Sequence, residues 1–224
     1  MQKKIIITGD GSPSFYISEL NETYHSKHGA VTESDYVYIK RGLVHWLDQN
    51  NQKKLKVFEM GMGTGLNVYL SYVFSINHKI SCEYFSIEKY PLQLKEIQSL
   101  NMKVSLPAGE HHHFFDQLHQ LEWNQMLSQS DFSFTKIKED FLNMALVQSF
   151  DVLFYDAFGY NAQSEMWQEK ALQKCYDLLN PGGIWVSYCA KGAVRRSLEK
   201  IGFVLERLEG PPGKREMLRA VKEV

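Results

Sequence analysis

From residue 55 to the end of the chain, short β-rich runs alternate with stretches of helical character. Strands that alternate with helices predict a parallel sheet covered on both faces, because each crossover between parallel strands needs a helix-length connection. The expected strands are residues 56–59, 83–87, 132–137, 152–156, 184–189, 204–208 and 216–221. The expected helices are residues 66–75, 92–100, 114–127, 165–179 and 193–200.

The last two expected strands break this alternation. Only residues 209–215 separate them, and that segment contains two glycines and two prolines. It is too short for a crossover helix, so the two strands are expected to pair antiparallel. The sequence therefore predicts an α/β fold with a mostly parallel, seven-stranded sheet that ends in an antiparallel hairpin. This is the layout of Rossmann-like methyltransferases.

Residues 1–54 are expected to form an N-terminal β-containing extension of the same domain, with residues 55–224 as its core. The extension contains a strand or hairpin at residues 3–8 and a turn at residues 10–13, followed by polar and aromatic segments. A chain of 224 residues has the length of one ordinary domain. The extension is interpreted as a lid over a substrate or cofactor.

The composition indicates a cytoplasmic protein without a global nucleic-acid signature. The 25 basic and 26 acidic residues nearly cancel, so any nucleic-acid contact must come from a local patch. No apolar run is long enough to span a membrane, and the short apolar stretch at the N-terminus is not followed by a cleavage site. Cys82, Cys175 and Cys189 lie far apart in sequence, as reduced thiols do in a cytoplasmic protein.

A glycine-rich turn joins the first core strand to the first core helix. Residues 57–66 read V-F-E-M-G-M-G-T-G-L, which places Gly61, Gly63 and Gly65 between strand and helix. Glycines let the backbone approach a ligand closely, and the helix N-terminus offers free N–H groups. The G-x-G-x-G spacing differs from the dinucleotide fingerprint and from the P-loop. A tight turn without a ligand is the alternative for this motif alone.

Acidic residues close three successive strands of the expected core: Glu59, Glu88 and Asp140. Ligands of open α/β sheets bind at these carboxyl ends. Glu59 before the turn disfavours a phosphate and suits the ammonium of S-adenosylmethionine (SAM). Glu88 suits both ribose hydroxyls, and Asp140 with its neighbour Phe141 suits adenine. Each acid alone is more often a solvated surface residue.

The fourth core strand ends in Asp156, followed closely by Phe158. In this layout that strand end faces the methyl group of SAM, so Asp156 is the candidate catalytic residue and also contacts the cofactor. Its carboxylate suits an amine, and Phe158 suits stacking on a base. The alternative is that Asp156 caps the following loop and Phe158 belongs to the core.

No metal site is expected, and a basic patch is expected at the C-terminal end. The histidines at residues 111–113 point in different directions on a helix, and no further ligands complete a site. Residues 191–224 hold nine basic and five acidic residues. Five of the basic residues are expected in loops or at helix starts: Lys191, Arg195, Arg196, Lys214 and Arg215. There they could contact the phosphate backbone of a nucleic acid. The alternative is that they form a solvated basic face.

Together these segments resemble the methyltransferase domain of the tRNA-modifying MnmC family, including its stand-alone MnmD type. The matching motifs are D-G-S at 10–12, Y-H-S-K-H-G-A-V-T-E-S at 24–34, F-E-M-G-M-G-T-G-L-N at 58–67, S-I-E-K-Y-P-L at 86–92, Y-D-A-F at 155–158, E-M-W at 165–167 and K-R-E-M-L at 214–218. The second and the last are far more specific than the glycine turn.

The resemblance implies SAM-dependent N-methylation of the primary amine of 5-aminomethyl-2-thiouridine at the tRNA wobble position. It adds Asn67 and Lys89 to the cofactor-binding residues, and Tyr24 and His25 to the substrate-binding residues. The family's second, FAD-dependent domain is not expected in this chain. Two rivals remain: an aminopropyltransferase that uses decarboxylated SAM, and a non-catalytic RNA-binding module that retains SAM.

Overall fold

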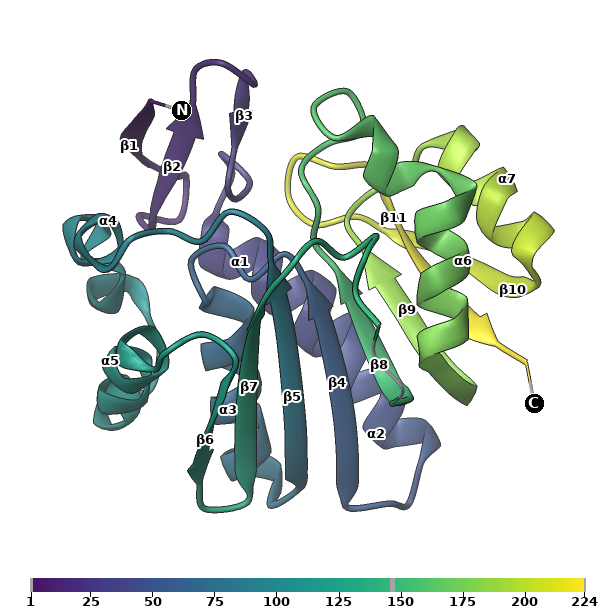
Figure 1. The fold of residues 1–224 in the computed structure, drawn as a ribbon, viewed down its shortest axis with the longest axis horizontal. Coiled ribbons are helices and arrows are strands. Elements are labelled where there is room, and N and C mark those ends of the chain that lie inside the picture. Colours follow the sequence, from purple (N-terminus) through teal and green to yellow (C-terminus); the bar gives the residue numbers. More distant parts are fainter. Residues whose placement is uncertain (1, 146–147, 224) are drawn as a thin grey trace.

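An eight-stranded mixed sheet forms the centre of the computed structural model, which describes residues 2–145 and 148–223 (Figure 1). The strand order is β10-β11-β9-β8-β4-β5-β7-β6. Strands β9, β8, β4, β5 and β7 run parallel, whereas β11, β10 and β6 are antiparallel to their neighbours. The bounds are β4 Lys54–Met60, β5 Ser81–Glu88, β6 Gln125–Gln129, β7 Phe132–Lys138, β8 Phe150–Tyr155, β9 Leu179–Ser187, β10 Phe203–Glu209 and β11 Glu216–Lys222. The expected fold class, including the antiparallel hairpin, is confirmed.

Strand β6 is the addition to the expected seven strands. The predicted helix at residues 114–127 was wrong at its end, because helix α5 (His112–Gln120) stops and the chain turns back through Asn124, whose φ is 63°. Residues Gln125–Gln129 then pair antiparallel with β7. This edge strand is mostly exposed, so no apolar alternation marked it in the sequence.

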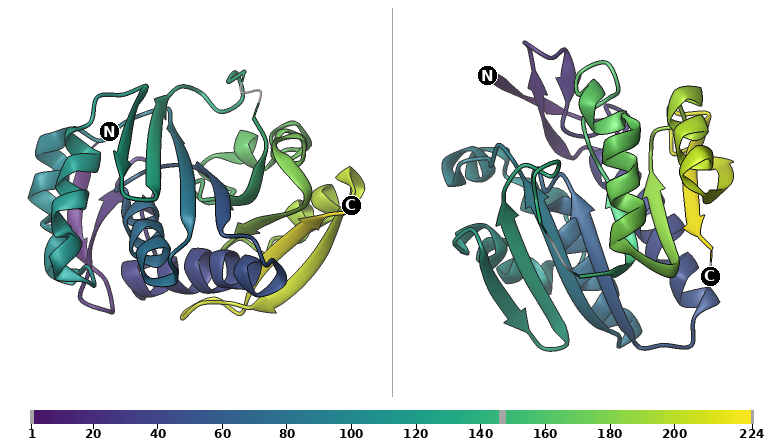
Figure 2. Two further views of the ribbon diagram at one scale, coloured as in Figure 1. Left: turned by 90° about the horizontal axis from the view of Figure 1, so that it is seen from below. Right: turned by 45° about the vertical axis from the view of Figure 1, so that its right-hand side comes forward.

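Helices cover both faces of the sheet (Figure 2). Helix α3 (Leu66–His78) lies on one face beside a continuous helical stretch formed by α1 (Ala30–Ser34), the π-type segment η1 (Asp35–Val44) and α2 (His45–Gln49). Helices α6 (Glu169–Leu178) and α7 (Gly192–Ile201) pack on the other face. The shorter elements are α4 (Leu94–Leu100), η2 (Met102–Ser105), η3 (Gly109–His111) and η4 (Ser164–Trp167). The helix over residues 30–49 was not predicted.

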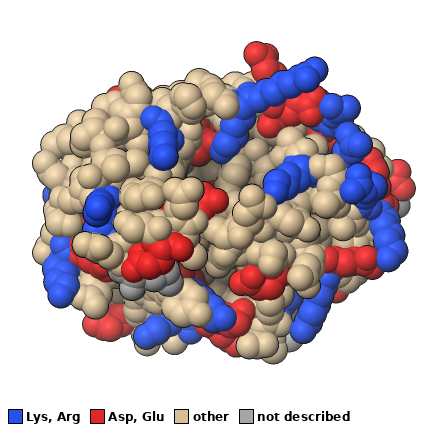
Figure 3. Space-filling view, turned by 90° about the horizontal axis from the view of Figure 1, so that it is seen from above, with Lys and Arg blue, Asp and Glu red and all other residues tan. Residues whose placement is uncertain are grey.

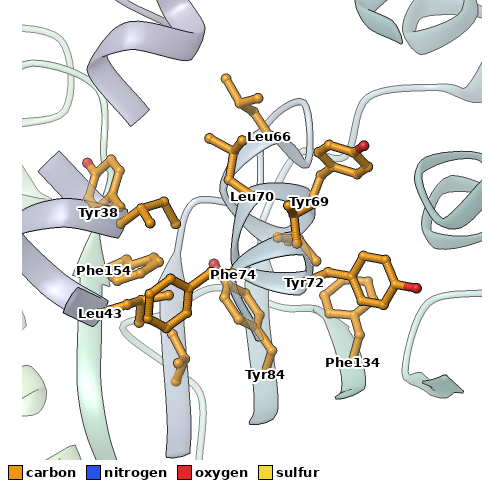
Figure 4. Close-up of a cluster of buried hydrophobic side chains, with 14 of the residues drawn as sticks. Tyr38, Leu43, Leu66, Tyr69, Leu70, Tyr72, Phe74, Tyr84, Phe134 and Phe154 are labelled. Carbon is orange, nitrogen blue, oxygen red and sulfur yellow. The ribbon is translucent and has the colours of Figure 1, made fainter. Parts of the chain in front are cut away.

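Two apolar layers hold these helices to the sheet, because successive side chains of a strand point to opposite faces. On the first face, Tyr38 of η1 packs against Phe154 of β8 with ring centroids 5.0 Å apart (Figure 4). On the second face, Leu153 and Trp185 lie in a cluster with the buried side of α6. Both faces of the central strands are therefore buried, as expected for a parallel sheet.

A small antiparallel sheet lies over the carboxyl ends of the central strands (Figure 1). It consists of β1 (Lys3–Ile7), β2 (Pro13–Ile17) and the short β3 (Glu22–Thr23). The expected hairpin near residues 3–8 is thus confirmed. In the described part of the chain, no helix combines the length and apolarity that crossing a membrane requires.

Candidate functional site

A cavity of about 910 Å³ opens at the carboxyl ends of β4, β5, β7 and β8. The chain continues from β4 to β5 on one side and later returns to β8 on the other, so the cavity lies where the strand order reverses. Ligands of open α/β sheets bind at this switch point. Figure 3 looks onto this end of the molecule and shows a hollow with acidic groups at its wall and Lys and Arg side chains around it.

The glycine turn brings the ends of β4 and β8 together. Gly61 has a φ of 93°, and a Cβ built on it would lie 2.6 Å from the backbone carbonyl oxygen of Asp156. The Asp156 N–H donates to the carbonyl of Met60 at 3.0 Å, directly before the turn. Glycine at residue 61 therefore permits a close approach that any side chain would disturb.

A buried polar network links the glycine turn to Asp156. Asn67, in the first turn of α3, donates through Nδ2 to both Glu59 and Asp156, each at 2.9 Å. Ser86 Oγ donates to the other oxygen of Glu59 at 2.6 Å. Burial raises the pKa of Glu59 to about 8, although both hydrogen bonds act in the opposite direction. The Oδ1 atom of Asn67 is buried and lacks a partner among the described residues.

Asp156 has an unusual proton affinity for an aspartate. Burial, with the Glu33 carboxylate adding to it, raises its pKa to about 7. The hydrogen bond from Asn67 opposes this shift, as does the charge of Lys214. The Asp156 side chain lines the cavity. A carboxyl group with a pKa near neutrality can both accept and release a proton at working pH.

These raised pKa values predict the sign of a pH effect on stability. The native state keeps protons on Asp156 and Glu59 that the unfolded chain has released by about pH 5. The free energy of unfolding therefore falls as pH rises toward 8. Buried His25 and His119, whose pKa values burial lowers to about 4 and about 3, oppose this trend only below about pH 6.5.

The ends of β5 and β7 hold two further acids of the cavity wall. Glu88 accepts the backbone N–H groups of Gly63 at 3.2 Å and Tyr90 at 2.8 Å, and burial raises its pKa. Asp140 forms an ion pair with Lys89 at 2.9 Å and accepts the N–H of Leu142.

Phe141 lines the cavity but is almost fully buried. Its ring packs against Phe58 and Tyr155. The side chain therefore belongs to the core as well as to the cavity wall, so only part of its surface is available to a ligand.

Aromatic side chains from two distant segments meet at the cavity. The ring of Tyr24 packs edge-on against Phe158, with centroids 5.1 Å apart, and also against Phe15 of β2. The neighbouring His25 is hydrogen-bonded through Nε2 to Thr64 Oγ1 of the glycine turn at 2.7 Å. The N-terminal extension is thereby tied to both the glycine turn and the loop after β8.

The predicted basic residues divide between the cavity wall and the surface. Lys214 lines the cavity, where its Nζ pairs with Glu33 at 2.5 Å and lies 3.7 Å from the ring centroid of Tyr188. Lys191 donates to Asn161 at 2.9 Å. Three others lie away from the cavity: Arg195, which is partly buried, and Arg196 and Arg215, which are exposed.

Most of the predicted site residues converge on this one cavity. Those that line it are Tyr24, His25, Gly61, Gly63, Asn67, Glu88, Lys89, Asp140, Phe141, Asp156, Phe158 and Lys214. Those outside its lining are Glu59, Gly65, Lys191, Arg195, Arg196 and Arg215. Glu59 is fully buried behind Asn67, so any effect of its charge on a ligand passes through that amide.

Sequence reasoning missed three side chains near Asp156. Tyr38 and Glu33 belong to the unpredicted helix, and Tyr188 follows β9 and donates to the carbonyl of Ala157 at 2.7 Å. Buried residues recur along that helix at three- to four-residue spacing, as at Ala30 and Ser34. This helical periodicity is the sequence signal from which the helix could have been predicted.

The cavity residues fit SAM. The unpartnered Oδ1 of Asn67 and the Asp156 carboxylate offer acceptors for the methionine ammonium, and Glu88 offers acceptors for ribose hydroxyls. The cavity volume falls in the range of small-molecule sites. Among the described residues, no cluster of His, Cys, Asp and Glu side chains has the arrangement of a metal site.

The chain is similar to known proteins in both sequence and structure. The chain is 26% identical over 219 residues to the tRNA 5-methylaminomethyl-2-thiouridine biosynthesis bifunctional protein MnmC of Marinomonas sp., covering 93% of this chain and 32% of that protein. It superposes on the crystal structure of MNMC2 from Aquifex aeolicus with a TM-score of 0.79 and 25% identity, covering 98% of this chain and 70% of that one. The chain spans about a third of the length of the curated relatives it matches.

A more distant solved structure shares the fold. The N-methyltransferase NodS from Bradyrhizobium japonicum matches with a TM-score of 0.50 and 12% identity, covering 83% of this chain and 94% of that one.

The family model described as S-adenosyl-L-methionine-dependent methyltransferase matches residues 88–223. The resemblance to the methyltransferase domain of MnmC is thus confirmed. Because the model matches more than half of the chain, the protein belongs to this family of S-adenosyl-L-methionine-dependent methyltransferases.

Proposed function

We propose that this protein methylates the primary amine of 5-aminomethyl-2-thiouridine at the tRNA wobble position. The observation that carries the proposal is Asp156: a cavity-lining carboxyl group with a pKa near 7, beside an aromatic pair that suits a nucleobase. The names of the MnmC relatives, which refer to biosynthesis of the methylated nucleoside, support it. The product is 5-methylaminomethyl-2-thiouridine.

SAM supplies a methyl group that is already activated by its sulfonium, so the protein's task is alignment and exclusion of water. Glu88 accepts hydrogen bonds from the ribose hydroxyls, and Asn67 holds the methionine ammonium. Asp140 and Phe141 bound the adenine side. The close approach of β4 and β8 at Gly61 sets the spacing between the cofactor side and the acceptor side.

On the acceptor side, Asp156 holds the amine and takes its proton. A primary alkyl amine is mostly protonated near neutral pH, and only the neutral form has the lone pair needed for attack. A carboxylate whose pKa is about 7 is better matched to this proton than an ordinary aspartate. Tyr24 and Phe158 offer aromatic surfaces for the flipped-out base, as proteins that read unstacked RNA bases do.

The extension, residues 1–54, closes over the substrate side of the core, residues 55–224. Its Tyr24–His25 segment contacts both the glycine turn and Phe158. The anticodon arm then meets the exposed cations of α7 and the β10–β11 loop, including Arg196 and Arg215. Lys214 serves the cavity wall instead, because Glu33 and Tyr188 already engage its ammonium.

The test is transfer of a deuterated methyl group from SAM to tRNA that carries the aminomethyl nucleoside, followed by nucleoside mass spectrometry. We expect the label in 5-methylaminomethyl-2-thiouridine, and none in matched tRNA with an unmodified wobble uridine. Label in another nucleoside would contradict the proposed substrate. Tight SAM and tRNA binding without turnover would favour a non-catalytic RNA-binding module instead.

A further inference from the structure

Glu22 of β3 brings a carboxyl group from the N-terminal extension to the cavity. It lines the cavity as Asp156 does, and a Cβ built on Gly159 would lie 2.5 Å from Glu22 Oε1. The carboxyl group therefore lies directly against the loop that follows β8. Two residues further along the chain, the ring of Tyr24 packs edge-on against Phe158 of the same loop. The extension and this loop thus form one wall, in which a carboxyl group lies close to an aromatic pair.

The backbone on each side of this contact is held in place. Strand β3 pairs antiparallel with β2, and the Tyr24 N–H donates to the carbonyl of Phe15 at 2.9 Å. In the loop after β8, the Phe158 carbonyl accepts the Trp167 indole N–H at 2.8 Å. The Phe158 N–H donates to Gln163 Oε1 at 3.0 Å. Both parts of the wall are therefore in position before a ligand binds.

The Glu22 carboxyl group has no polar partner in the part of the chain that the structure describes. Neither oxygen accepts a hydrogen bond, and no basic nitrogen lies within 4.0 Å of it. Burial raises its pKa, whereas the more distant charges of Lys214 and Lys27 act in the opposite direction. The carboxyl group of Glu33, by contrast, is already paired with Lys214. Glu22 therefore offers a free acceptor to a donor on the ligand.

The ring of the proposed substrate carries one such donor. In a uracil, N3 bears a hydrogen, whereas the substituents at C2 and C4 only accept. A cytosine has a lone pair at N3, which a carboxylate would repel, because a carboxylate also only accepts. Proteins read unstacked bases at this edge. Asp156 and Gly159 are three residues apart, so their Cα atoms lie no more than about 11 Å apart. A base whose aminomethyl arm meets Asp156 can thus present its N3 edge to Glu22.

We propose that Glu22 is a specificity-determining residue, whose carboxylate accepts the N3–H of the target uracil and so selects uridine over cytidine. This inference rests on the proposed function. Holding the amine is the other use that a carboxylate could have here. Asp156 is better placed for that role, because it contacts the glycine turn through Asn67 and Gly61, where the methyl group arrives. Glu22 contacts the loop three residues beyond Asp156.

The test uses two anticodon stem-loop RNAs that differ only at the wobble residue, 5-aminomethyl-2-thiouridine or 5-aminomethyl-2-thiocytidine. The ratio of their kcat/KM values for methylation measures the selectivity. We expect the parent protein to favour uridine by about 10–100-fold. In Glu22→Gln the ratio should fall at least about tenfold, because the amide keeps the size of the side chain and can donate to the N3 of cytosine. An equal loss on both RNAs, as a purely structural role would give, would overturn the inference.

Glu19→Gln is the matched control. It removes the same charge from the turn between β2 and β3, where Glu19 is exposed and outside the cavity lining. It should keep the parent ratio. Gly159→Ala displaces the Glu22 carboxyl group without removing its charge, because the new Cβ would meet the end of a flexible side chain. Its ratio should fall at least about threefold. A parent-like ratio in Glu22→Gln or in Gly159→Ala would overturn the inference.

Binding of the two RNAs separates this inference from the proposed function. Fluorescence anisotropy in the presence of S-adenosylhomocysteine gives the ratio of their Kd values without turnover. If the parent protein methylates neither RNA, the proposed function fails. A preference for the uridine RNA that Glu22→Gln abolishes would then still support the role of Glu22, and equal affinities in the parent protein would refute it. If the parent methylates the uridine RNA and Glu22→Gln keeps the selectivity, only the inference fails.

Discussion

Replacing Gly61 with alanine is expected to separate the ends of β4 and β8. The new Cβ would lie 2.6 Å from the carbonyl oxygen of Asp156, and backbone atoms cannot move aside as the end of a flexible side chain can. The residue also has a φ of 93°, which alanine rarely adopts. Both effects act at the point where the cofactor side of the cavity meets the acceptor side.

The two effects can be separated with a matched control at Gly11. Gly11 has a φ of 83°, but no atom lies within 4 Å of a Cβ built on it. Gly11→Ala should therefore lower the free energy of unfolding only by the cost of the backbone conformation, about 1–2 kcal/mol. Gly61→Ala should lower it by the same amount and by a further ~1–3 kcal/mol, because the new Cβ overpacks the site. For a chain of this size each kcal/mol corresponds to roughly 2–4 °C in melting temperature.

Urea unfolding of both variants and the parent protein, followed by circular dichroism, measures the difference. We expect Gly61→Ala to be less stable than Gly11→Ala by at least about 1 kcal/mol. Equal destabilisation of the two variants would refute the idea that close approach, rather than backbone conformation alone, requires glycine at residue 61.

Three further predictions concern the cavity and its surroundings. Glu88→Ala should weaken SAM binding by about 1–3 kcal/mol in titration calorimetry, and unchanged affinity would rule out Glu88 as the ribose acceptor. Between pH 6.5 and 8, the free energy of unfolding should fall less in Asp156→Asn than in the parent protein, because one titrating group contributes at most ~1.4 kcal/mol per pH unit to this fall. Urea unfolding at several pH values measures the slope, and an unaltered slope would show that Asp156 is not the titrating acid. Arg196→Glu with Arg215→Glu should weaken tRNA binding and flatten its salt dependence, whereas Lys53→Glu, next to the opposite end of β4, should not; equal effects in filter binding would place the tRNA elsewhere.

The sequence predicted those parts of the fold that follow from local patterns. Central strands such as β8 are nearly continuous apolar runs because both of their faces are buried, and that pattern is visible without a structure. The acids Glu88, Asp140 and Asp156 were placed together because parallel strands end at one edge of the sheet. The structure places all three at the cavity, whereas their roles toward SAM and the amine stay predictions.

The helix over residues 30–49 could not be recognised so readily. Its interior contains β-branched and aromatic residues, and Gly42, which ordinarily argues against a helix. In the structure this glycine lets the helix approach the sheet, since a Cβ there would lie 3.1 Å from the ring of Phe154. A tertiary contact thus overrides local propensity, and Tyr38 and Glu33 were missed with the helix.

Pairings between distant residues were also invisible in the sequence. Lys214 was predicted to contact phosphate because of the local excess of positive charge. Its partner Glu33 lies 181 residues away in the chain, and only the fold brings the two together. Glu59 was predicted to contact the cofactor because it lies at the end of a strand. In the structure the Asn67 side chain covers its carboxyl group, and the sequence pattern did not reveal that contact.

The central claim is that SAM and the acceptor amine meet between the glycine turn and Asp156. A crystal structure of the protein with S-adenosylhomocysteine tests this most directly. We expect the ribose hydroxyls within hydrogen-bond distance of Glu88, the amino group beside Asn67 and the sulfur facing the Asp156 side of the cavity. A ligand bound outside this cavity, or with its ribose turned away from Glu88 and its sulfur away from Asp156, would contradict the account.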